Sequence, residues 1–162
     1  MDVIVYKNPD PASNALCVMS PGLISANEAA ELYLAPYDIT YAIVNQQTLP
    51  DGSYIPEALT IEFDEFGGPH YGWDLPMAKE LAIFYNSGYW QAQYNHGLLG
   101  LPIQTQYQLN LAIATPENER TADQVAAIEF MVGINGLQND VEDQINAATT
   151  GEQIVGILNQ LG

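Results

Sequence analysis

The chain has few of the residues that many catalytic and metal-binding proteins require. Cys17 is its only cysteine, which excludes an intrachain disulfide and a thiolate metal cluster and favours a reducing compartment. His70 and His96 are its only histidines, and neither has the ordered ligand spacing of a zinc site. We expect structural roles for both, His70 in a turn and His96 at a helix terminus. No apolar run approaches the roughly 20 residues that cross a bilayer, and no basic n-region of a secretory signal is present.

Positive charge is also scarce. Lys7, Lys79 and Arg120 stand against 20 aspartates and glutamates, for a formal net charge of -17. Nucleic acids and anionic membranes are bound mainly through lysine and arginine, so neither is expected as a partner. The acidic excess leaves two interpretations, which are attraction of a basic partner and solubility through self-repulsion.

The first part of the chain has the pattern of a small sheet with one short helix. Short β-prone runs bounded by turn residues predict strands at 3–6, 15–19, 41–44 and 58–63. Ser25 and Glu28 have the spacing of a capping box, which predicts a helix over about 25–34. The Pro-Asp-Gly turn at 50–52 is expected to join the third and fourth strands as a hairpin. The Gly/Pro-rich stretch at 67–72 is expected to interrupt regular secondary structure before the next helix.

From Asp74 onward the apolar spacing is helical. Asp74 is a candidate N-cap of a helix that runs to about Asn95. Its apolar stripe is Met77, Leu81, Phe84 and Tyr85. Further helices are expected at 103–114, from about Thr121, and after Thr149 or Thr150. Gly133 and Gly136 weaken the helix that begins near Thr121, so a break in it before Leu137 is left open.

These patterns together predict an α+β fold. A small N-terminal antiparallel sheet with one short helix is followed by a helical C-terminal region of three to four helices. We expect the sheet domain to comprise residues 1–68, and the helical region, residues 69–162, to bind the partner.

Acidic residues are densest in and on either side of the fourth predicted strand, 58–63. The patch consists of Glu57, Glu62, Asp64 and Glu65. Paired carboxylates can serve acid–base chemistry or bind calcium, but this run lacks the ligand spacing of a calcium loop. A solvated strand edge is the favoured interpretation. Since no phosphate loop or nucleophile elbow is present either, we expect no enzyme, catalytic residue, cofactor or metal. A carbohydrate hydrolase that uses two of these carboxylates is the catalytic alternative.

An aromatic cluster marks the first long helix. Tyr85 and Tyr89 share one predicted face, and Trp90 and Tyr94 share an adjacent one. A helix that is apolar on more than one side must be buried on more than one side or meet a partner. Because tyrosine and tryptophan anchor many interfaces, these four residues are the candidate partner-binding set. A role in the core is the equal alternative.

Several short motifs follow one another in a family-like order. Tyr-Lys-Asn at 6–8 is followed by SANEAAEL at 25–32, Leu-Pro-Asp at 49–51 and Asp-Leu-x-Met-Ala-Lys-Glu at 74–80, and the chain closes with LQNDV at 137–141 and AATTGEQI at 147–154. This order resembles small tailed-phage proteins encoded beside tail-fibre genes, the tail-fibre assembly (chaperone) proteins. The chain departs from the family at 51–55, where many relatives carry Asp-Arg-Thr-Phe-Arg and this sequence has Asp-Gly-Ser-Tyr-Ile.

The resemblance implies a non-catalytic protein that binds a phage tail-fibre protein or another tail protein in the host cytoplasm during assembly. One alternative is a structural adaptor or capping subunit that stays in the virion tail or baseplate. A third hypothesis, from the charge alone, is a DNA-mimic inhibitor of a host nuclease, but the acids are clustered at 57–65 rather than spaced like phosphates. Self-association is left open.

Overall fold

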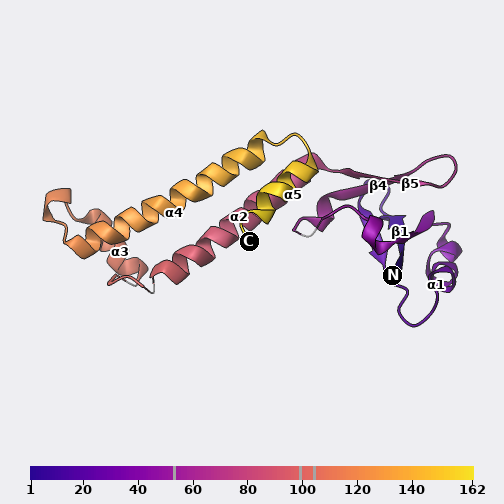
Figure 1. Ribbon diagram of the computed structural model, residues 1–162, viewed down its shortest axis with the longest axis horizontal. Helices are drawn as coiled ribbons and strands as arrows, with labels where there is room; N and C mark the ends of the chain where they lie inside the picture. The colour runs from indigo at the N-terminus through magenta and orange to yellow at the C-terminus, as the bar shows by residue number, and fades with distance from the viewer. Residues whose placement is uncertain (53, 99, 104) are drawn as a thin grey trace. The chain divides into compact units, whose positions relative to one another are not determined.

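The chain folds into two compact units. The computed structural model describes residues 1–52, 54–98, 100–103 and 105–162 (Figure 1). Unit 1 comprises residues 1–81 and 149–156, and unit 2 comprises residues 82–148 and 157–162. The contacts thus group residues 69–81 with the sheet, whereas the sequence placed the domain boundary at 68/69; that boundary stays a prediction. The predicted α+β class, with a small antiparallel sheet followed by a helical region, is confirmed.

Unit 1 is organised around its first strand. β1 (Asp2–Lys7) lies between β2 (Leu16–Met19) and β3 (Tyr41–Asn45), and both pairings are antiparallel. The consecutive residues 3–5 of β1, Val-Ile-Val, are all buried. Neighbouring side chains on a strand point to opposite faces, so burial of all three means that both faces of the sheet are covered.

The two faces of this sheet have different covers. On one face Ile4 packs against Ala30 of α1 (Ala26–Tyr33). On the other face Val3 and Val5 pack against Ile61 of β4 (Leu59–Phe63), which pairs with β5 (Pro69–Trp73) in a separate two-stranded sheet. Unit 1 is therefore layered as helix, three-stranded sheet and hairpin.

Two predictions about this unit are wrong. Residues 67–72 are not an irregular break in secondary structure, because 69–73 form β5. Gly67, at a φ of 80°, accommodates the tight turn before it. Pro69 is tolerated as the first residue of a strand, where a missing N–H disrupts little. Strands β3 and β4 also do not form a hairpin with each other, since β3 pairs with β1 and β4 with β5.

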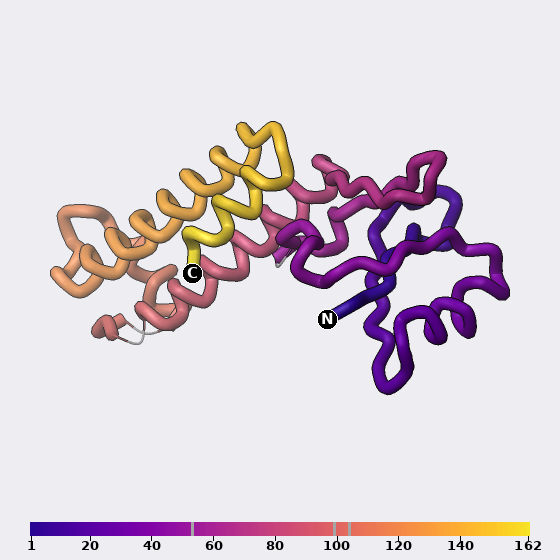
Figure 2. The backbone as a smooth tube through the Cα atoms, turned by 45° about the vertical axis from the view of Figure 1, so that its right-hand side comes forward, coloured from indigo at the N-terminus to yellow at the C-terminus, as the bar shows by residue number. Residues whose placement is uncertain are grey.

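Helical segments make up most of the remaining chain. Their bounds are α2 (Leu75–Leu98), α3 (Gln106–Ala114), α4 (Ala122–Ala147) and α5 (Gly151–Asn159), with short 3-10 turns at Ala35–Tyr37, Gln46–Thr48, Pro56–Ala58 and Glu117–Glu119. Within unit 2, α4 runs back alongside the part of α2 that follows Leu81 (Figure 2). The buried core at the α3 end of this pair is Ile103, Leu109, Ala112 and Ala127.

The helix caps match the sequence predictions closely. The Ser25 hydroxyl accepts from the Glu28 amide at 3.2 Å, and the Glu28 carboxylate accepts from the Ser25 amide at 2.9 Å. Asp74 Oδ1 accepts from the Met77 amide at 3.1 Å, which confirms Asp74 as an N-cap. The Thr150 hydroxyl likewise accepts from the Gln153 amide, at 3.3 Å.

One predicted helix start differs from the structure, and the break left open in another helix does not occur. α3 begins at Gln106 rather than at 103, because Thr105 provides the cap, and Gln104 lies outside the described residues. α4 continues unbroken through Gly133 and Gly136, both of which are exposed. None of the helices in the described ranges combines the length and apolarity that crossing a membrane requires.

Candidate functional site

The four aromatic candidates of α2 all lie in unit 2 and are all half-buried. The rings of Tyr89 and Trp90 meet edge to face, with centroids 5.1 Å apart. Tyr94 stacks on Phe130 of α4, with centroids 6.0 Å apart and ring planes 17° from parallel. Such pairs contribute roughly 0.5–1.5 kcal/mol beyond their buried area. Tyr94 therefore helps to hold α2 against α4, and the role of the four aromatic residues in partner binding stays a prediction.

A small polar cleft lies beside this cluster. It has a volume of about 200 Å³. Its lining residues are Trp90, Gln91 and Tyr94 of α2, Gln106 of α3, and Met131, Ile134, Asn135 and Gln138 of α4. The Tyr94 hydroxyl lies 3.5 Å from Gln106 Oε1, and burial raises the pKa of that hydroxyl above its ordinary value. The tyrosine is thus a neutral hydrogen-bonding group at physiological pH, among amides that both donate and accept.

Two buried polar atoms of α2 have no hydrogen-bond partner among the residues that the structure describes. They are Nε1 of Trp90 and Oδ1 of Asn86. Asn86 is fully buried, and its Nδ2 donates to the carbonyl of Gln138 at 3.0 Å. A buried polar group without a partner costs about 1–3 kcal/mol. The interior of the α2–α4 pair is therefore less stable than a purely apolar one would be.

Among the described residues of unit 2, the most exposed large apolar side chains were not among the sequence candidates. They are Phe84 of α2 (80% exposed), Tyr107 (76%) and Leu111 (54%) of α3, and Val132 (59%) and Leu137 (49%) of α4. Tyr107 and Leu111 are four residues apart and share a face of α3. The sequence placed Phe84 in the apolar stripe of its helix, and the structure leaves this side chain exposed. Helical spacing alone identifies apolar stripes without showing which of them another helix covers.

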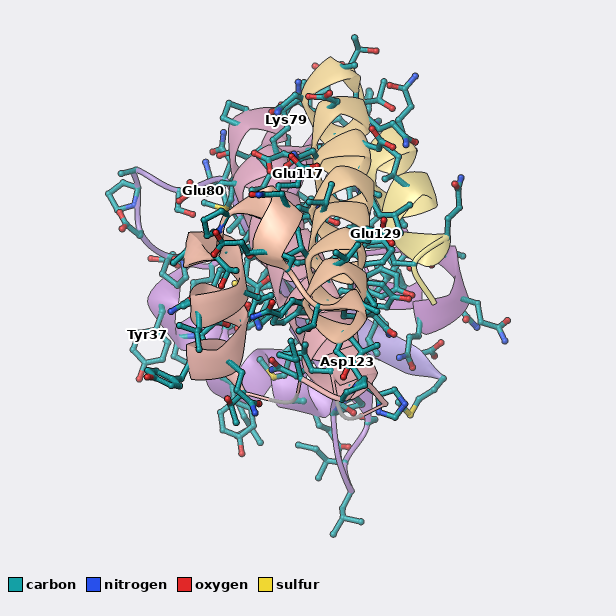
Figure 3. All side chains as sticks on the ribbon, turned by 90° about the vertical axis from the view of Figure 1, so that its left-hand side faces the viewer. Tyr37, Lys79, Glu80, Glu117, Asp123 and Glu129 are labelled. Carbon is teal, nitrogen blue, oxygen red and sulfur yellow. The ribbon has the colours of Figure 1, made fainter. Side chains whose placement is uncertain are left out.

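Acidic side chains accompany these apolar ones. Glu117, Asp123 and Glu129 are exposed and come from the turn before α4 and from α4 itself (Figure 3). Arg120 is the only lysine or arginine in the sequence of unit 2. Its guanidinium donates to the carbonyl oxygens of Thr115, at 3.0 Å, and Ile113, at 3.4 Å. The single cation of this unit is thus engaged with the end of α3.

In unit 1, the acidic patch of the sequence is divided between different tasks. Asp64 Oδ1 accepts from the amides of Phe66 and Gly68, at 2.9 and 2.8 Å, and Oδ2 lies 3.0 Å from His70 Nε2. The Gly68 amide first, then His70 and the Phe66 amide, hold the pKa of Asp64 below its ordinary value. Asp64 and His70 therefore stabilise the β4–β5 turn, while Glu62 and Glu65 are exposed.

The surroundings of Cys17 and His96 do not indicate a reactive or metal-binding role either. Cys17 is half-buried in β2, and burial raises the pKa of its thiol, which disfavours the reactive thiolate. His96 lies in the last turn of α2. Among the residues that the structure describes, no group of three or more histidine, cysteine, aspartate or glutamate side chains could hold a metal ion. No family model matches the chain, and neither a curated protein nor a solved structure is significantly similar to it.

Proposed function

We propose that the protein is a phage tail-fibre assembly chaperone or tail-associated protein that binds a fibre protein without catalysis. Two observations support the proposal. The motifs from 6–8 to 147–154 follow the order of that family in the sequence. The observation that carries it is the set of large apolar side chains left exposed on the helices of unit 2: Phe84, Tyr107, Leu111, Val132 and Leu137.

Exposed apolar side chains with acidic neighbours suit this task. Burying a side chain such as Phe84 or Tyr107 against a partner removes apolar surface from water, which contributes about 1.5–3 kcal/mol per residue. Several such anchors together can hold an aggregation-prone segment of another protein. The acidic groups nearby keep the free protein soluble through mutual repulsion. Tyr85, Tyr89, Trp90 and Tyr94 belong to the same surface in this proposal, through the parts of their rings that remain exposed.

Co-expression tests the proposal. The fibre protein encoded beside this chain is produced with and without it in the host cytoplasm, and the yield of soluble fibre trimer is measured. The test variant carries Tyr107→Ser and Leu111→Ser; the matched control carries Leu32→Ser and Tyr33→Ser on α1, which are 61% and 59% exposed. We expect the native chain and the α1 control to raise the trimer yield and the α3 variant to lose most of that effect. Equal yields with and without the chain would reject the proposal.

Purified phage particles distinguish the two forms of the proposal. A chaperone dissociates once the fibre has assembled, so mass spectrometry of the particles should not detect this chain. Its recovery in a fixed ratio to the fibre protein would instead identify an adaptor or capping subunit of the tail or baseplate.

A further inference from the structure

Unit 1 contains a cleft of about 500 Å³ that the proposed function does not use. One wall is the loop 12–15, which follows β1. The remaining lining residues are Glu57, Thr60, Trp73, Asp74 and Met77. Because they come from the turn before β4, from β4 itself and from the junction of β5 with α2, the hairpin and the helix start build the cleft together. All of them belong to unit 1.

Trp73 is fixed in the wall of this cleft. Its Nε1 donates to Glu152 Oε1 at 2.7 Å. Its ring lies against Gly151, where an added Cβ would overlap the indole. The backbone amide of Glu152 and the indole N–H hold the pKa of that carboxyl below its ordinary value, so Glu152 is ionised at neutral pH. A carboxylate on the indole N–H increases the negative charge of the ring face, which strengthens its attraction for a cation.

Two further carboxylates reach the same cleft. Glu57 is exposed and forms no hydrogen bond or ion pair within the described part of the chain. Asp74 Oδ1 accepts the hydrogen bond that caps α2, and Oδ2 takes no part in that bond. No lysine or arginine is among the described residues that line the cleft. The negative charge beside Trp73 is therefore not balanced from within the cleft.

We propose that this cleft binds the guanidinium group of an arginine side chain on a partner protein. A planar guanidinium stacks on an aromatic ring and pairs with carboxylates through parallel hydrogen bonds, whereas the compact ammonium of lysine does neither as well. Trp73 supplies the stacking face, and Glu57 and Asp74 supply the carboxylates. The net charge of -17 makes a basic partner the complementary occupant. Since the ring is already held by Glu152 and Gly151, little side-chain freedom is lost on binding.

Titration of the full chain with N-acetyl-L-argininamide, followed by NMR, tests the site. The chain has two tryptophans, so two indole N–H resonances are expected, and a Trp90→Phe variant assigns them. We expect the Trp73 resonance to shift saturably and the Trp90 resonance to stay in place. The neutral isostere N-acetyl-L-citrullinamide should cause no saturable shift, and N-acetyl-L-lysinamide should bind more weakly.

Two charge-removing variants locate the binding groups. Glu57→Gln removes an unpaired carboxylate, and Asp74→Asn removes charge while keeping a good N-cap. Each should weaken argininamide binding by about two- to fivefold, the range for partly exposed ion pairs. Glu65→Gln, an equally acidic position outside the cleft, should leave binding unchanged. A Trp73 resonance that does not respond would overturn the proposal, as would an equal response to citrullinamide or lysinamide or equal affinity in all three variants.

Discussion

Two glycines of α2 should respond in opposite directions to the same substitution. Gly88 is exposed, and a Cβ added there would meet no atom within 4 Å. Gly97 is half-buried, and a Cβ added there would overlap the ring of Phe130 on α4. We therefore predict that Gly88→Ala raises the free energy of unfolding and that Gly97→Ala lowers it.

The expected magnitudes follow from these surroundings. At Gly88 alanine stabilises the helix by about 0.5–1 kcal/mol, because glycine loses more backbone freedom on folding. At Gly97 that gain is small, since α2 ends at Leu98. The Phe130 ring must move away from Tyr94, which forfeits a stacking contribution of roughly 0.5–1.5 kcal/mol and adds an overpacking cost of about 1–3 kcal/mol. A net loss of about 1–4 kcal/mol is expected.

Urea unfolding followed by far-ultraviolet circular dichroism measures both changes. In a chain of this length, 1 kcal/mol also shifts the thermal midpoint by about 2–4 °C. Phe130→Leu provides the control, because a shorter side chain should relieve most of the cost of Gly97→Ala and reveal a coupling between the two positions. The reasoning is refuted if Gly97→Ala is as stable as Gly88→Ala, or if its cost is unchanged in the Phe130→Leu background.

Three further predictions concern individual polar side chains. Asn86→Leu should stabilise the protein by about 1 kcal/mol in urea unfolding, because it removes a buried acceptor without a partner, whereas Asn86→Asp should destabilise it by introducing a buried charge. The pKa of Asp64 is lowered in the folded state, so its stabilisation of the turn is present above the ordinary value of 3.8 and lost as the pH falls below it. The Gly68 amide resonance should report this loss, and Asp64→Asn should abolish it. Ser25→Ala should cost about 1 kcal/mol in thermal unfolding, and a loss no larger than that of Ala26→Gly would contradict its capping role.

Local signals in the sequence were the ones that predicted structure well. The Ser25 cap, the Asp74 cap and the strand around Val3–Val5 depend on residues within a few positions of one another. Their hydrogen bonds and burial in the structure confirm them. Gly133 and Gly136 show the limit of such reasoning, because a helix packed along its length tolerates residues of low intrinsic propensity.

Features that depend on distant partners could not be predicted in the same way. An alternating strand pattern shows which side chains share a face but not which strand lies beside it, so the pairing of β3 with β1 was missed. The contact between Trp73 and Glu152 joins residues 79 positions apart. Spacing also gave no means of telling the stacked Tyr94 from the exposed Phe84, because that difference is set by the position of α4.

The discontinuity of unit 1 has a consequence for synthesis on the ribosome. Its sheet, hairpin and the first turns of α2 lie within residues 1–81, whereas the segment 149–156 that supplies Glu152 and Gly151 is translated 67 residues later. The intervening chain contains nearly all of unit 2 and has time to fold first. A nascent chain therefore carries Trp73 without Gly151 and Glu152 until the 77 residues between positions 73 and 151 have been translated. Unit 1 can be completed only after nearly all of unit 2 has been translated.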